Sequence, residues 1–342
     1  MPTILITGAS GFIGSALIRY LYSSRGLQQY GGPTIKALVH DTEARNLRRL
    51  SEGPVRLGME RNSIQIVNGD LVHGASGLCE GVDFVIHCAA KTFVDHAILD
   101  PAIFVQTNVV GTLNLLEDAR RYKVKRFIFV STDETLGSIA EGAYAEDAPT
   151  RPTNVYSASK AGGEALAMAY AKTYGLHTII TRTENNFGFW QNPQKVFPTF
   201  VKKLLAKEKL PVYGDGKHVR QWLWVEDHCR ALMLFLFADV PPGDVFHVAG
   251  NQELTNTDLA LKIIRAYLRE EGIGGHGRPD HELMEMHVGF IPDHDIRPGH
   301  DRRYALNCDK LRAATGWSPE VGLDDGIRRA VSWYVSNEWW LR

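Results

Sequence analysis

The segment Ile4–Gly14 (ILITGASGFIG) most constrains the fold of this 342-residue chain, because three glycines follow a β-rich run at GxxGxxG spacing. The first glycine permits a tight turn, the second a close approach of the backbone to a pyrophosphate, and the third close helix–strand packing. The helix that begins here presents unpaired N–H groups and a positive dipole end to phosphates. Glycines also mark ordinary turns, but this position directly after a strand predicts a dinucleotide site. Its expected residues are Gly8, Gly11, Phe12, Ile13 and Gly14.

Strand-like and helix-like segments alternate through the first half of the chain. The apolar runs expected to form strands are Ile4–Ile6, Ile35–Val39, Ile64–Val67, Phe84–His87 and Phe127–Val130. Segments with helical periodicity lie between them, at Gly14–Ser23, Pro101–Tyr122 and Ser157–Tyr174. The polar, Gly-containing segment Ser24–Pro33 is expected to be a loop. Apolar strands that alternate with helices predict an α/β fold with a doubly wound parallel sheet of the Rossmann type.

The pattern changes after Ile180, where Pro- and Gly-rich segments become frequent. Loops are expected at Phe187–Pro198, Leu210–Lys217 and Gly289–Arg303, and helices near Lys202–Lys209, Val225–Phe237 and Thr257–Glu270. We therefore expect a dinucleotide-binding domain in residues 1–180 and a smaller α+β substrate lobe in residues 181–342, with some later segments returning to the first sheet. The aromatic residues expected to pack the last helix onto this lobe are Trp333, Tyr334, Trp339 and Trp340.

The composition is that of an ordinary globular protein and argues against several classes of partner. The formal net charge is −1 and the pI is about 6.9, so neither nucleic acid nor an anionic membrane is expected. The chain shows no run of roughly 18 apolar residues and no secretory signal, which predicts a cytoplasmic protein. The spacings of its four cysteines and of the histidines between His281 and His300 match no ligand set, so no metal is expected.

The ends of the second and third predicted strands indicate how the adenosine half of the dinucleotide is bound. Asp41 is placed to accept hydrogen bonds from the ribose hydroxyls and to repel a 2′-phosphate, which favours NAD over NADP. His40, Arg45 and Arg48 lie nearby and are able to bind a 2′-phosphate, so NADP stays an alternative. The other explanation of the two arginines is a solvated helix face. Asp70 is positioned to accept a hydrogen bond from the adenine amine, or else belongs to an ordinary turn.

Tyr156 and Lys160 have the YxxxK spacing, which places a phenol and an ammonium group on one helix face. A free phenol, with a pKa of about 10, is a poor base at neutral pH. An adjacent lysine and a nicotinamide cation both favour the phenolate. A pair on a helix surface is the alternative interpretation, but the preceding strand ends in the hydroxyls of Ser131 and Thr132, which together with the glycine loop favours a catalytic role.

Asp133 and Glu134 follow Thr132 directly and narrow the predicted reaction. They lie at the carboxyl end of a strand, which is the edge where open α/β sheets bind ligands. Simple hydride transfer needs neither carboxyl group. Elimination of water beside a ketone needs a base for the carbon-bound proton and an acid for the departing hydroxyl. Adjacent carboxylates at the start of a loop are usually solvated, so the pair supports this reaction only together with the other motifs.

With these motifs, the chain resembles the dTDP-glucose 4,6-dehydratase family of extended short-chain dehydrogenases/reductases nearly from end to end. The matching segments are TGASGFIG (7–14), AAKTFVDHA (89–97), TNVVGT (107–112), VSTDETLG (130–137), YSASK (156–160), NNFG (185–188), LPVYGDGKHVRQWLWVEDHCRAL (210–232) and RPGHDRRYAL (297–306). The Thr-Asp-Glu triplet and the last segment are the most specific, because they separate these dehydratases from epimerases on the same scaffold.

The resemblance implies a role for each catalytic position. Tyr156, assisted by Thr132 and Lys160, removes the O4 proton of a hexose while NAD accepts the C4 hydride. Glu134 then takes the C5 proton, Asp133 protonates the departing C6 hydroxyl, and the hydride returns to C6. The product is a nucleotide-linked 4-keto-6-deoxy sugar, and the enzyme is a lyase. The resemblance also implies a homodimer that pairs through the helices at 101–122 and 157–174.

Binding residues follow from the same resemblance. Those implied for the cofactor, besides the glycine loop, are Asp41, Asp70, Leu71, Ala89, Ala90, Lys91, Thr107, Tyr156, Lys160 and Asn186. Those implied for the nucleotide sugar are Thr92, Thr132, Asn185, Lys195, Val196, Pro211, Tyr213, Arg220, Asn251, Arg297 and His300. The charged members of this set suit a pyrophosphate, which charge-assisted hydrogen bonds hold well.

Some positions depart from the family pattern. Lys91 and Phe93 stand where the family has Glu and His, Leu136 replaces a tyrosine, Glu184 alters the segment before NNFG, and Ile296 replaces an acidic residue. The sequence therefore does not fix the nucleobase or the sugar of the substrate. The alternatives are a UDP-sugar dehydratase, a nucleotide-sugar 4-epimerase or decarboxylase, and a non-catalytic NAD-binding sensor. The sensor is disfavoured because it needs none of the intact catalytic residues, and an epimerase has no use for a base at C5.

Overall fold

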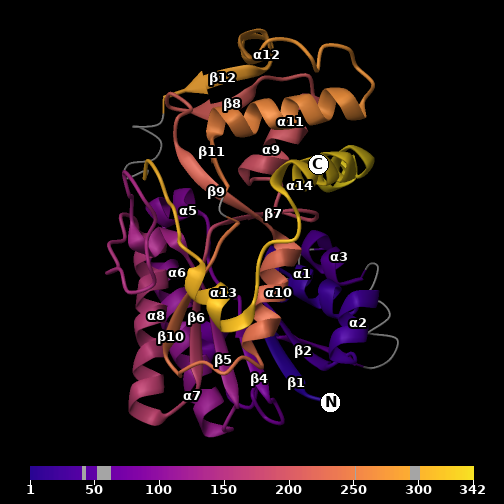
Figure 1. Cartoon of the computed structure of the whole chain (residues 1–342). Helices are drawn as coiled ribbons and strands as arrows, with labels where there is room; N and C mark the ends of the chain where they lie inside the picture. The colour runs from indigo at the N-terminus through magenta and orange to yellow at the C-terminus, as the bar shows by residue number, and fades with distance from the viewer. Residues whose placement is uncertain (41–43, 52–62, 251, 293–300) are drawn as a thin grey trace.

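The computed structural model describes the whole chain except residues 41–43, 52–62, 251 and 293–300, and its centre is a parallel sheet (Figure 1). Within the described residues this sheet has seven strands in the order β10-β6-β5-β4-β1-β2-β3. The strand order reverses between β1 and β4, which is the switch point where open sheets of this type bind ligands. The strands are β1 (Thr3–Thr7), β2 (Thr34–Val39), β3 (Ile64–Asn68), β4 (Phe84–His87), β5 (Arg126–Thr132), β6 (Thr178–Thr183) and β10 (Asp244–Val248).

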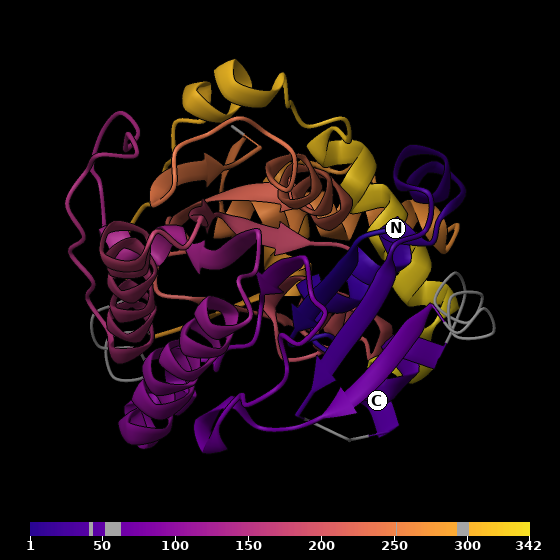
Figure 2. The same cartoon turned by 90° about the horizontal axis from the view of Figure 1, so that it is seen from below.

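Helices cover both faces of the sheet (Figures 1 and 2) because successive strand residues point to opposite sides. Ile4 and Ile6 enter one core and Leu5 enters the other. The first core is closed by α1 (Phe12–Leu21), α3 (Ala44–Ser51), α10 (Val225–Phe235) and α13 (Asp309–Thr315), with α2 (Ser24–Tyr30) beside α1. The second side carries η1 (Leu71–His73), α5 (Val94–Leu99), α6 (Pro101–Val105), η2 (Gln106–Val110), α7 (Gly111–Arg121) and α8 (Val155–Tyr174).

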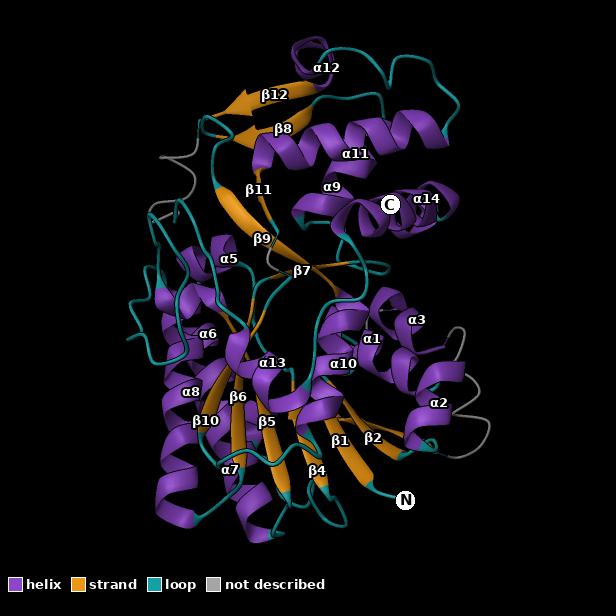
Figure 3. Ribbon diagram, in the orientation of Figure 1, coloured by secondary structure: helices purple, strands orange, loops and turns teal. Residues whose placement is uncertain are grey.

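A smaller lobe with its own core lies beyond the carboxyl edge of the large sheet (Figure 3). One three-stranded sheet has the order β11-β9-β7, and a second sheet pairs β12 with β8 in parallel. The strands are β7 (Asn185–Phe187), β8 (Leu210–Tyr213), β9 (Val219–Trp224), β11 (Glu253–Thr255) and β12 (Val288–Ile291). The helices are α9 (Val196–Leu205), α11 (Asn256–Glu270), α12 (Asp280–His287), α14 (Leu323–Ser336) and η4 (Glu338–Trp340).

The strands and helices expected in the first half are confirmed, but the loop expected at Ser24–Pro33 is wrong. Ser24–Tyr30 forms α2, which begins where the Ser23 hydroxyl accepts the N–H of Gly26 at 3.1 Å. Gly26 is required by packing, since a Cβ there would lie 2.1 Å from the carbonyl oxygen of Tyr20. The glycine that indicated a loop marks the close approach of two helices.

The expectations for the second half are less accurate. Strand β6 extends past Ile180, and the helix expected at Lys202–Lys209 is α9, which begins at Val196 inside an expected loop. The other two expected loops contain β8 and the end of β12, which pair with each other. Partners so distant in the sequence leave no local pattern, so these short strands could not be predicted from residue spacing.

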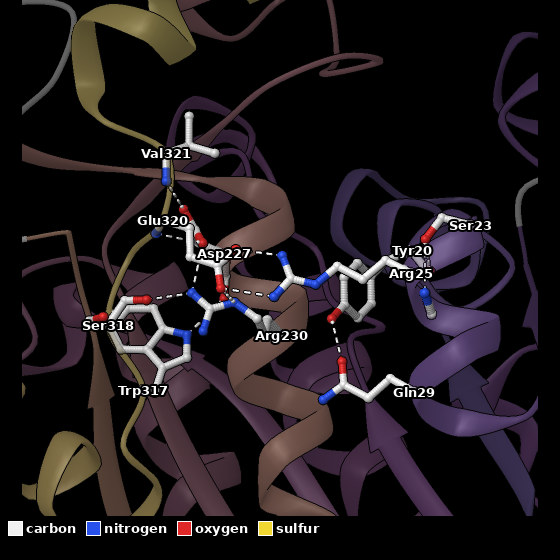
Figure 4. A network of polar contacts seen from close by, with 11 residues as sticks. Tyr20, Ser23, Arg25, Gln29, Asp227, Arg230, Trp317, Ser318, Glu320 and Val321 are labelled. Atoms are coloured by element: carbon white, nitrogen blue, oxygen red, sulfur yellow. Dashed lines mark hydrogen bonds and ion pairs between the residues drawn. The ribbon is translucent and has the colours of Figure 1, made fainter.

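A polar network around buried Asp227 joins α10 and α2 to the segment between α13 and α14 (Figure 4). Asp227 of α10 accepts the backbone N–H groups of Glu320 and Val321 at 2.9 and 3.0 Å, and also accepts from Arg230 at 2.9 Å. Arg25 of α2 reaches the Glu320 carboxylate at 2.8 Å. The segment between α13 and α14 is thereby fixed to the first core, because a buried carboxylate requires these donors.

The C-terminal aromatic residues pack on the smaller lobe as expected. Trp340 is fully buried, its ring lies 5.1 Å from that of Trp190, and its indole N–H donates to the carbonyl of Gln191 at 2.8 Å. Buried Arg49 lies 4.7 Å above the Trp340 ring and donates to the carbonyl of Ser10 at 2.8 Å. The end of the chain therefore contacts the arginine that supports the glycine loop.

Trp340→Ala is expected to lower the free energy of unfolding by about 3–5 kcal/mol, because it leaves a large cavity in the core. The neighbouring Trp339 is 37% exposed and stacks with Arg48, so Trp339→Ala serves as the matched control with an expected loss of about 1 kcal/mol. Urea unfolding followed by circular dichroism measures both. Equal losses for the two variants would contradict the packing described here.

Candidate active site

The end of β5 places the predicted Thr132, Asp133 and Glu134 side by side at the carboxyl edge of the sheet. Thr132 begins the short helix η3 (Asp133–Leu136), and its hydroxyl accepts the N–H of Glu134 at 3.3 Å. The same hydroxyl donates to Asp133 Oδ1 at 3.1 Å, while Asp133 Oδ2 is buried without a hydrogen-bond partner among the described residues. Asp133 is 4% exposed and Glu134 is partly buried. The strand end thus holds two carboxyl groups away from bulk water.

Burial is the main electrostatic influence on this pair. It raises the pKa of Asp133 to about 7, and the neighbouring Glu134 adds to the rise while Arg220 opposes it. Burial also raises the pKa of Glu134, which Arg220, Lys195 and a hydrogen bond from Asn154 oppose. A carboxyl group with a pKa near 7 holds or releases a proton at neutral pH, which is what acid–base chemistry requires.

Helix α8 brings Tyr156 and Lys160 to the same edge. Asn154 and Ser157 form a capping box that fixes the start of this helix. Lys160 is buried, donates to the carbonyl of Val130 at 2.7 Å and lies 4.2 Å from the centre of the Phe129 ring. Burial lowers the pKa of Lys160 to about 8. The two predicted residues therefore meet the end of β5 from one helix face.

The protein's own groups act on Tyr156 in the opposite direction from the sequence expectation. Burial raises the pKa of the phenol, and the charges of Glu134 and Asp133 raise it further, while the Thr132 hydroxyl opposes the rise. Lys160 directs its ammonium group to the Val130 carbonyl. A phenolate at neutral pH therefore needs a positive charge beyond those the side chains supply, as a nicotinamide cation provides.

The predicted glycine loop has the close contacts that a dinucleotide site requires. Gly8 has φ +65°, and a Cβ there would lie 2.8 Å from the backbone N of Ala89. A Cβ at Gly14 would lie 2.4 Å from the carbonyl oxygen of Gly8. Gly11 precedes α1, which contains Phe12 and Ile13, and no side chain caps this helix start. These are the features of a backbone cradle for phosphates.

Asn108 belongs to this site, but the sequence analysis missed it. Its side chain is buried in the π-helical turn η2, next to the predicted Thr107, and binds both backbone groups of Lys91, at 2.9 and 3.1 Å. It also donates to Ser159 at 2.9 Å. Asn108 thus fixes the loop of Ala89, Ala90 and Lys91 against α8. A π turn inside a helix is the signal, since such turns are frequent at functional sites, but it is visible only in three dimensions.

The adenosine end is only partly described, because Asp41 lies outside the described residues. Asp70 accepts the N–H of Val72 at 2.9 Å and lies 3.2 Å from His40 Nε2, while Leu71 is buried in the core. Arg48 packs on Trp339. The turn interpretation of Asp70 therefore holds in this structure, and its contact with adenine stays a prediction.

Positive groups approach the site from the smaller lobe. Lys195, just before Val196, donates to the carbonyl of Thr92 at 3.2 Å and lies 4.2 Å from the Phe93 ring centre. Arg220 of β9 donates to the carbonyl of Asp301 at 2.8 Å and lies 4.4 Å from the ring of Tyr304. Both cations oppose the rise in the pKa of Glu134, so both are electrostatically coupled to the carboxyl pair.

Other predicted residues are placed less centrally. Asn185 lies on β7, and Pro211 and Tyr213 lie on β8. Asn186 turns its amide inward, to Thr183 and the carbonyl of Glu184, both at 3.0 Å. Asn251, Arg297 and His300 lie outside the described residues, as does the departure at Ile296. Asp301 and Tyr304, which the analysis missed, hydrogen-bond each other at 2.6 Å beside Arg220.

The described part of the chain contains no group of three His, Cys, Asp or Glu side chains arranged to hold a metal ion. None of the described helices combines the length and the apolarity needed to cross a lipid bilayer.

Known proteins are similar to this chain over nearly its whole length. The chain matches the family model described as GDP-mannose 4,6 dehydratase over residues 5–330. It is 40% identical over 341 residues to the dTDP-glucose 4,6-dehydratase of Streptomyces niveus, covering 98% of this chain and 94% of the relative. The crystal structure of the dTDP-glucose 4,6-dehydratase of Streptomyces venezuelae with NAD bound has a TM-score of 0.85 and 36% identity, covering 99% of this chain and 98% of that one. A UDP-glucuronic acid 4-epimerase of Bacillus cereus, 24% identical with a TM-score of 0.82 over 98% of this chain and 99% of its own, shares the fold.

Asp133→Asn is expected to remove a pH-dependent loss of stability. The folded-state pKa of about 7 lies above the usual 3.8, so the stability that this carboxyl contributes is fully present below about pH 3.8 and is lost as the pH rises through about 7. The shift corresponds to roughly 4 kcal/mol. Urea unfolding without substrate at about pH 4 and about pH 8 should show a smaller difference for the variant than for the unchanged chain. The exposed Asp147→Asn is the control, and an unaltered pH dependence in Asp133→Asn would refute the assignment.

Proposed function

This chain belongs to the dTDP-glucose 4,6-dehydratase family, and from that premise we propose how its residues remove water from dTDP-glucose. The enzyme is an NAD-dependent nucleotide-sugar 4,6-dehydratase, a hydro-lyase whose product is the 4-keto-6-deoxy sugar nucleotide. The observation that carries the proposal is the pair of buried or partly buried carboxyl groups, Asp133 and Glu134, beside Tyr156. Elimination uses both groups, whereas epimerisation at C4 uses neither.

The glycine loop and its neighbours fit NAD. The close contacts at Gly8 and Gly14 leave no room for a side chain, so the backbone itself lines the place where phosphates bind. Asn108 fixes the loop that begins at Ala89 after the strand. NAD, when bound, supplies a reversible acceptor for the hydrogen at C4 of the sugar and the positive charge that favours the Tyr156 phenolate.

Tyr156 removes the O4 proton in the first stage. The Thr132 hydroxyl hydrogen-bonds the phenol and orients it. Lys160, whose pKa is lowered to about 8 by burial, is held in place by its hydrogen bond to the Val130 carbonyl. Glu134 then takes the proton from C5, and Asp133 gives its proton to the C6 hydroxyl, which leaves as water. Finally Glu134 returns its proton to C5, so only Asp133 ends this sequence without the proton it began with.

The nucleotide end of the substrate is assigned to the cations of the smaller lobe. Lys195 and Arg220 are the described members, and Arg297 and His300 are proposed to join them. Thr92, Asn185, Val196, Pro211, Tyr213 and Asn251 are proposed to line the same site. Lys91 and Phe93 border the sugar in this proposal, so a UDP-linked sugar is the principal alternative substrate. The boundary between a cofactor domain and a substrate lobe near residue 180 is likewise a proposal, as is a cytoplasmic location, which the free cysteines support.

Homodimer formation is proposed through the α6–α8 side of the sheet. Several exposed apolar side chains lie on the elements of this flank, and a large exposed apolar surface on a monomer usually marks an interaction site. They are Ile98, Leu99, Ile103, Val105, Val110, Leu113 and Tyr174. A twofold interface made of these helices buries this surface on both subunits, since each residue i of one subunit packs on a residue j of the other and the reverse contact also forms.

Leu113→Glu is expected to weaken such a dimer by at least about 3 kcal/mol, roughly a hundredfold, because it buries an unpaired carboxylate on each subunit. Sedimentation equilibrium measures the effect. Ile273→Glu changes a similarly exposed apolar residue after α11 and is the control. A Leu113→Glu protein that sediments like the unchanged chain would contradict this interface.

Glu134→Gln is expected to permit oxidation at C4 but to slow dehydration by about 10²–10⁴-fold, because the amide cannot accept the C5 proton. NMR of the products from dTDP-glucose and UDP-glucose, offered separately with deuterium at C4, measures both the substrate preference and the transfer of deuterium to C6. Undiminished dehydration by Glu134→Gln rules out its role as the base. Loss of the deuterium to solvent in the unchanged chain rules out the internal redox cycle, and absence of any product favours the sensor.

A further inference from the structure

A third carboxyl group, Glu184, lies beside the two already described. Strands β5 and β6 are paired up to Thr132 and Thr183, so Asp133 and Glu184 are the next residues beyond a pair of register partners. Glu184 is 3% exposed, as deeply buried as Asp133. The proposed function leaves this group without a task.

Glu184 is held at one oxygen and unsatisfied at the other. Its Oε1 accepts the backbone N–H of Gly250 at 2.6 Å. Its Oε2, like Asp133 Oδ2, is buried with no hydrogen-bond partner among the described residues. Buried carboxyl oxygens of this kind require a partner, and a proton with a bridging water provides one for both residues.

The charges around Glu184 favour its protonated form. Burial raises its pKa well above the usual range, and the charges of Asp133 and Glu253 raise it further, against the single backbone N–H of Gly250. Around Asp133, Glu134 and Arg220 act in opposite directions. Burial and the two neighbouring charges therefore favour a proton on Glu184, next to a group that gives one away.

A pocket of about 120 Å³ reaches Gly250, the residue that binds Glu184. Trp222, Trp224 and Gln252 line it, and both indole N–H groups are buried without a partner among the described residues. A pocket of this size has room for ordered water. The glycine loop lines no part of it, and its other lining residues are Phe187, Leu223, Pro319, Val321, Gly322 and Leu323.

The proposed function creates a need for such a water-linked acid. Each turnover takes one proton from Asp133 into the water that leaves, while the O4 proton stays on Tyr156. Asp133 must therefore regain a proton before the next turnover, and a substrate bound against it separates it from solvent on that side.

We propose that Glu184 reprotonates Asp133 after each turnover, fed by water in the pocket at Gly250; this inference rests on the proposed function. The O–H bond of the Glu184 carboxyl breaks, a bridging water passes the proton, and an O–H bond forms on Asp133. Glu184 regains its proton from solvent through the pocket water, and Tyr156 releases the O4 proton to solvent, so protons balance over one turnover and no electrons are transferred. Glu184 acts through Asp133 and is a relay residue.

The test compares one turnover with many. Glu184→Gln keeps an acceptor for the Gly250 N–H but carries no acidic proton. With enzyme in excess its rate of product formation should stay within about twofold of the unchanged chain, because Asp133 begins protonated; with substrate in excess, kcat should fall at least about tenfold after a burst of one product per site. Glu146→Gln is the matched control, since Glu146 also accepts a backbone N–H, from His247 at 3.4 Å, and should leave both rates unchanged.

Gly322→Leu gives a second test that leaves every carboxyl group in place. Gly322 lines the pocket, and a Cβ there meets nothing within 4 Å, so a larger side chain is tolerated at this wall without a clash at its base. It should reduce multiple turnover and spare single turnover. Equal losses in both regimes for Glu184→Gln, or undiminished multiple turnover in both variants, overturn the relay.

Infrared difference spectroscopy separates the relay from the proposed function. At neutral pH the unchanged chain minus Glu184→Gln should show the C=O band of a protonated carboxylic acid, whatever substrate the enzyme uses. Absence of this band overturns the relay even if dehydration occurs. Absence of dehydration by the unchanged chain, with the band present, overturns the proposed function and the relay that depends on it.

Discussion

The parallel pairing of β5 with β6 is the constraint on which the site depends. It ends both strands at the same level, Thr132 opposite Thr183, so the two segments that follow must leave the sheet between the main core and the smaller lobe. Asp133 and Glu184 are thereby buried by topology, before any property of their side chains is considered. The altered proton affinities follow from this burial, because a desolvated carboxylate is costly.

That burial opposes stability, and the rest of the structure compensates for it. Arg220 and Lys195 offset part of the charge, and the Thr132 hydroxyl and the Gly250 N–H supply single hydrogen bonds. Two oxygens are nevertheless left without partners in the described residues. Unsatisfied buried groups cost on the order of 1–3 kcal/mol each, and such strain is typical of functional sites because substrate or a proton relieves it.

The sequence predicts those parts of the site that lie on one element. The glycine spacing, the Tyr156–Lys160 pair and the Thr132–Glu134 strand end are local patterns, and the structure gives each the expected place. Asn108 and the contact of Arg220 with Asp301 join segments distant in sequence, so no spacing reveals them. The rise in the pKa of Tyr156 without a cofactor could not be predicted for a similar reason, since it depends on burial and on carboxylates from another element. At Ser24–Pro33 the glycine content indicated a loop, whereas Gly26 lies inside a helix at a close packing contact.

The contacts of Arg49 tie the two ends of the chain to one another. Its guanidinium group supports the Ser10 carbonyl on one side and lies against Trp340 on the other. The glycine loop precedes Trp340 by almost the whole sequence, so it is synthesised long before the ring that lies against its supporting arginine. A fully formed cradle is therefore not a property of the N-terminal half alone, because it also requires the segment that contains Trp340.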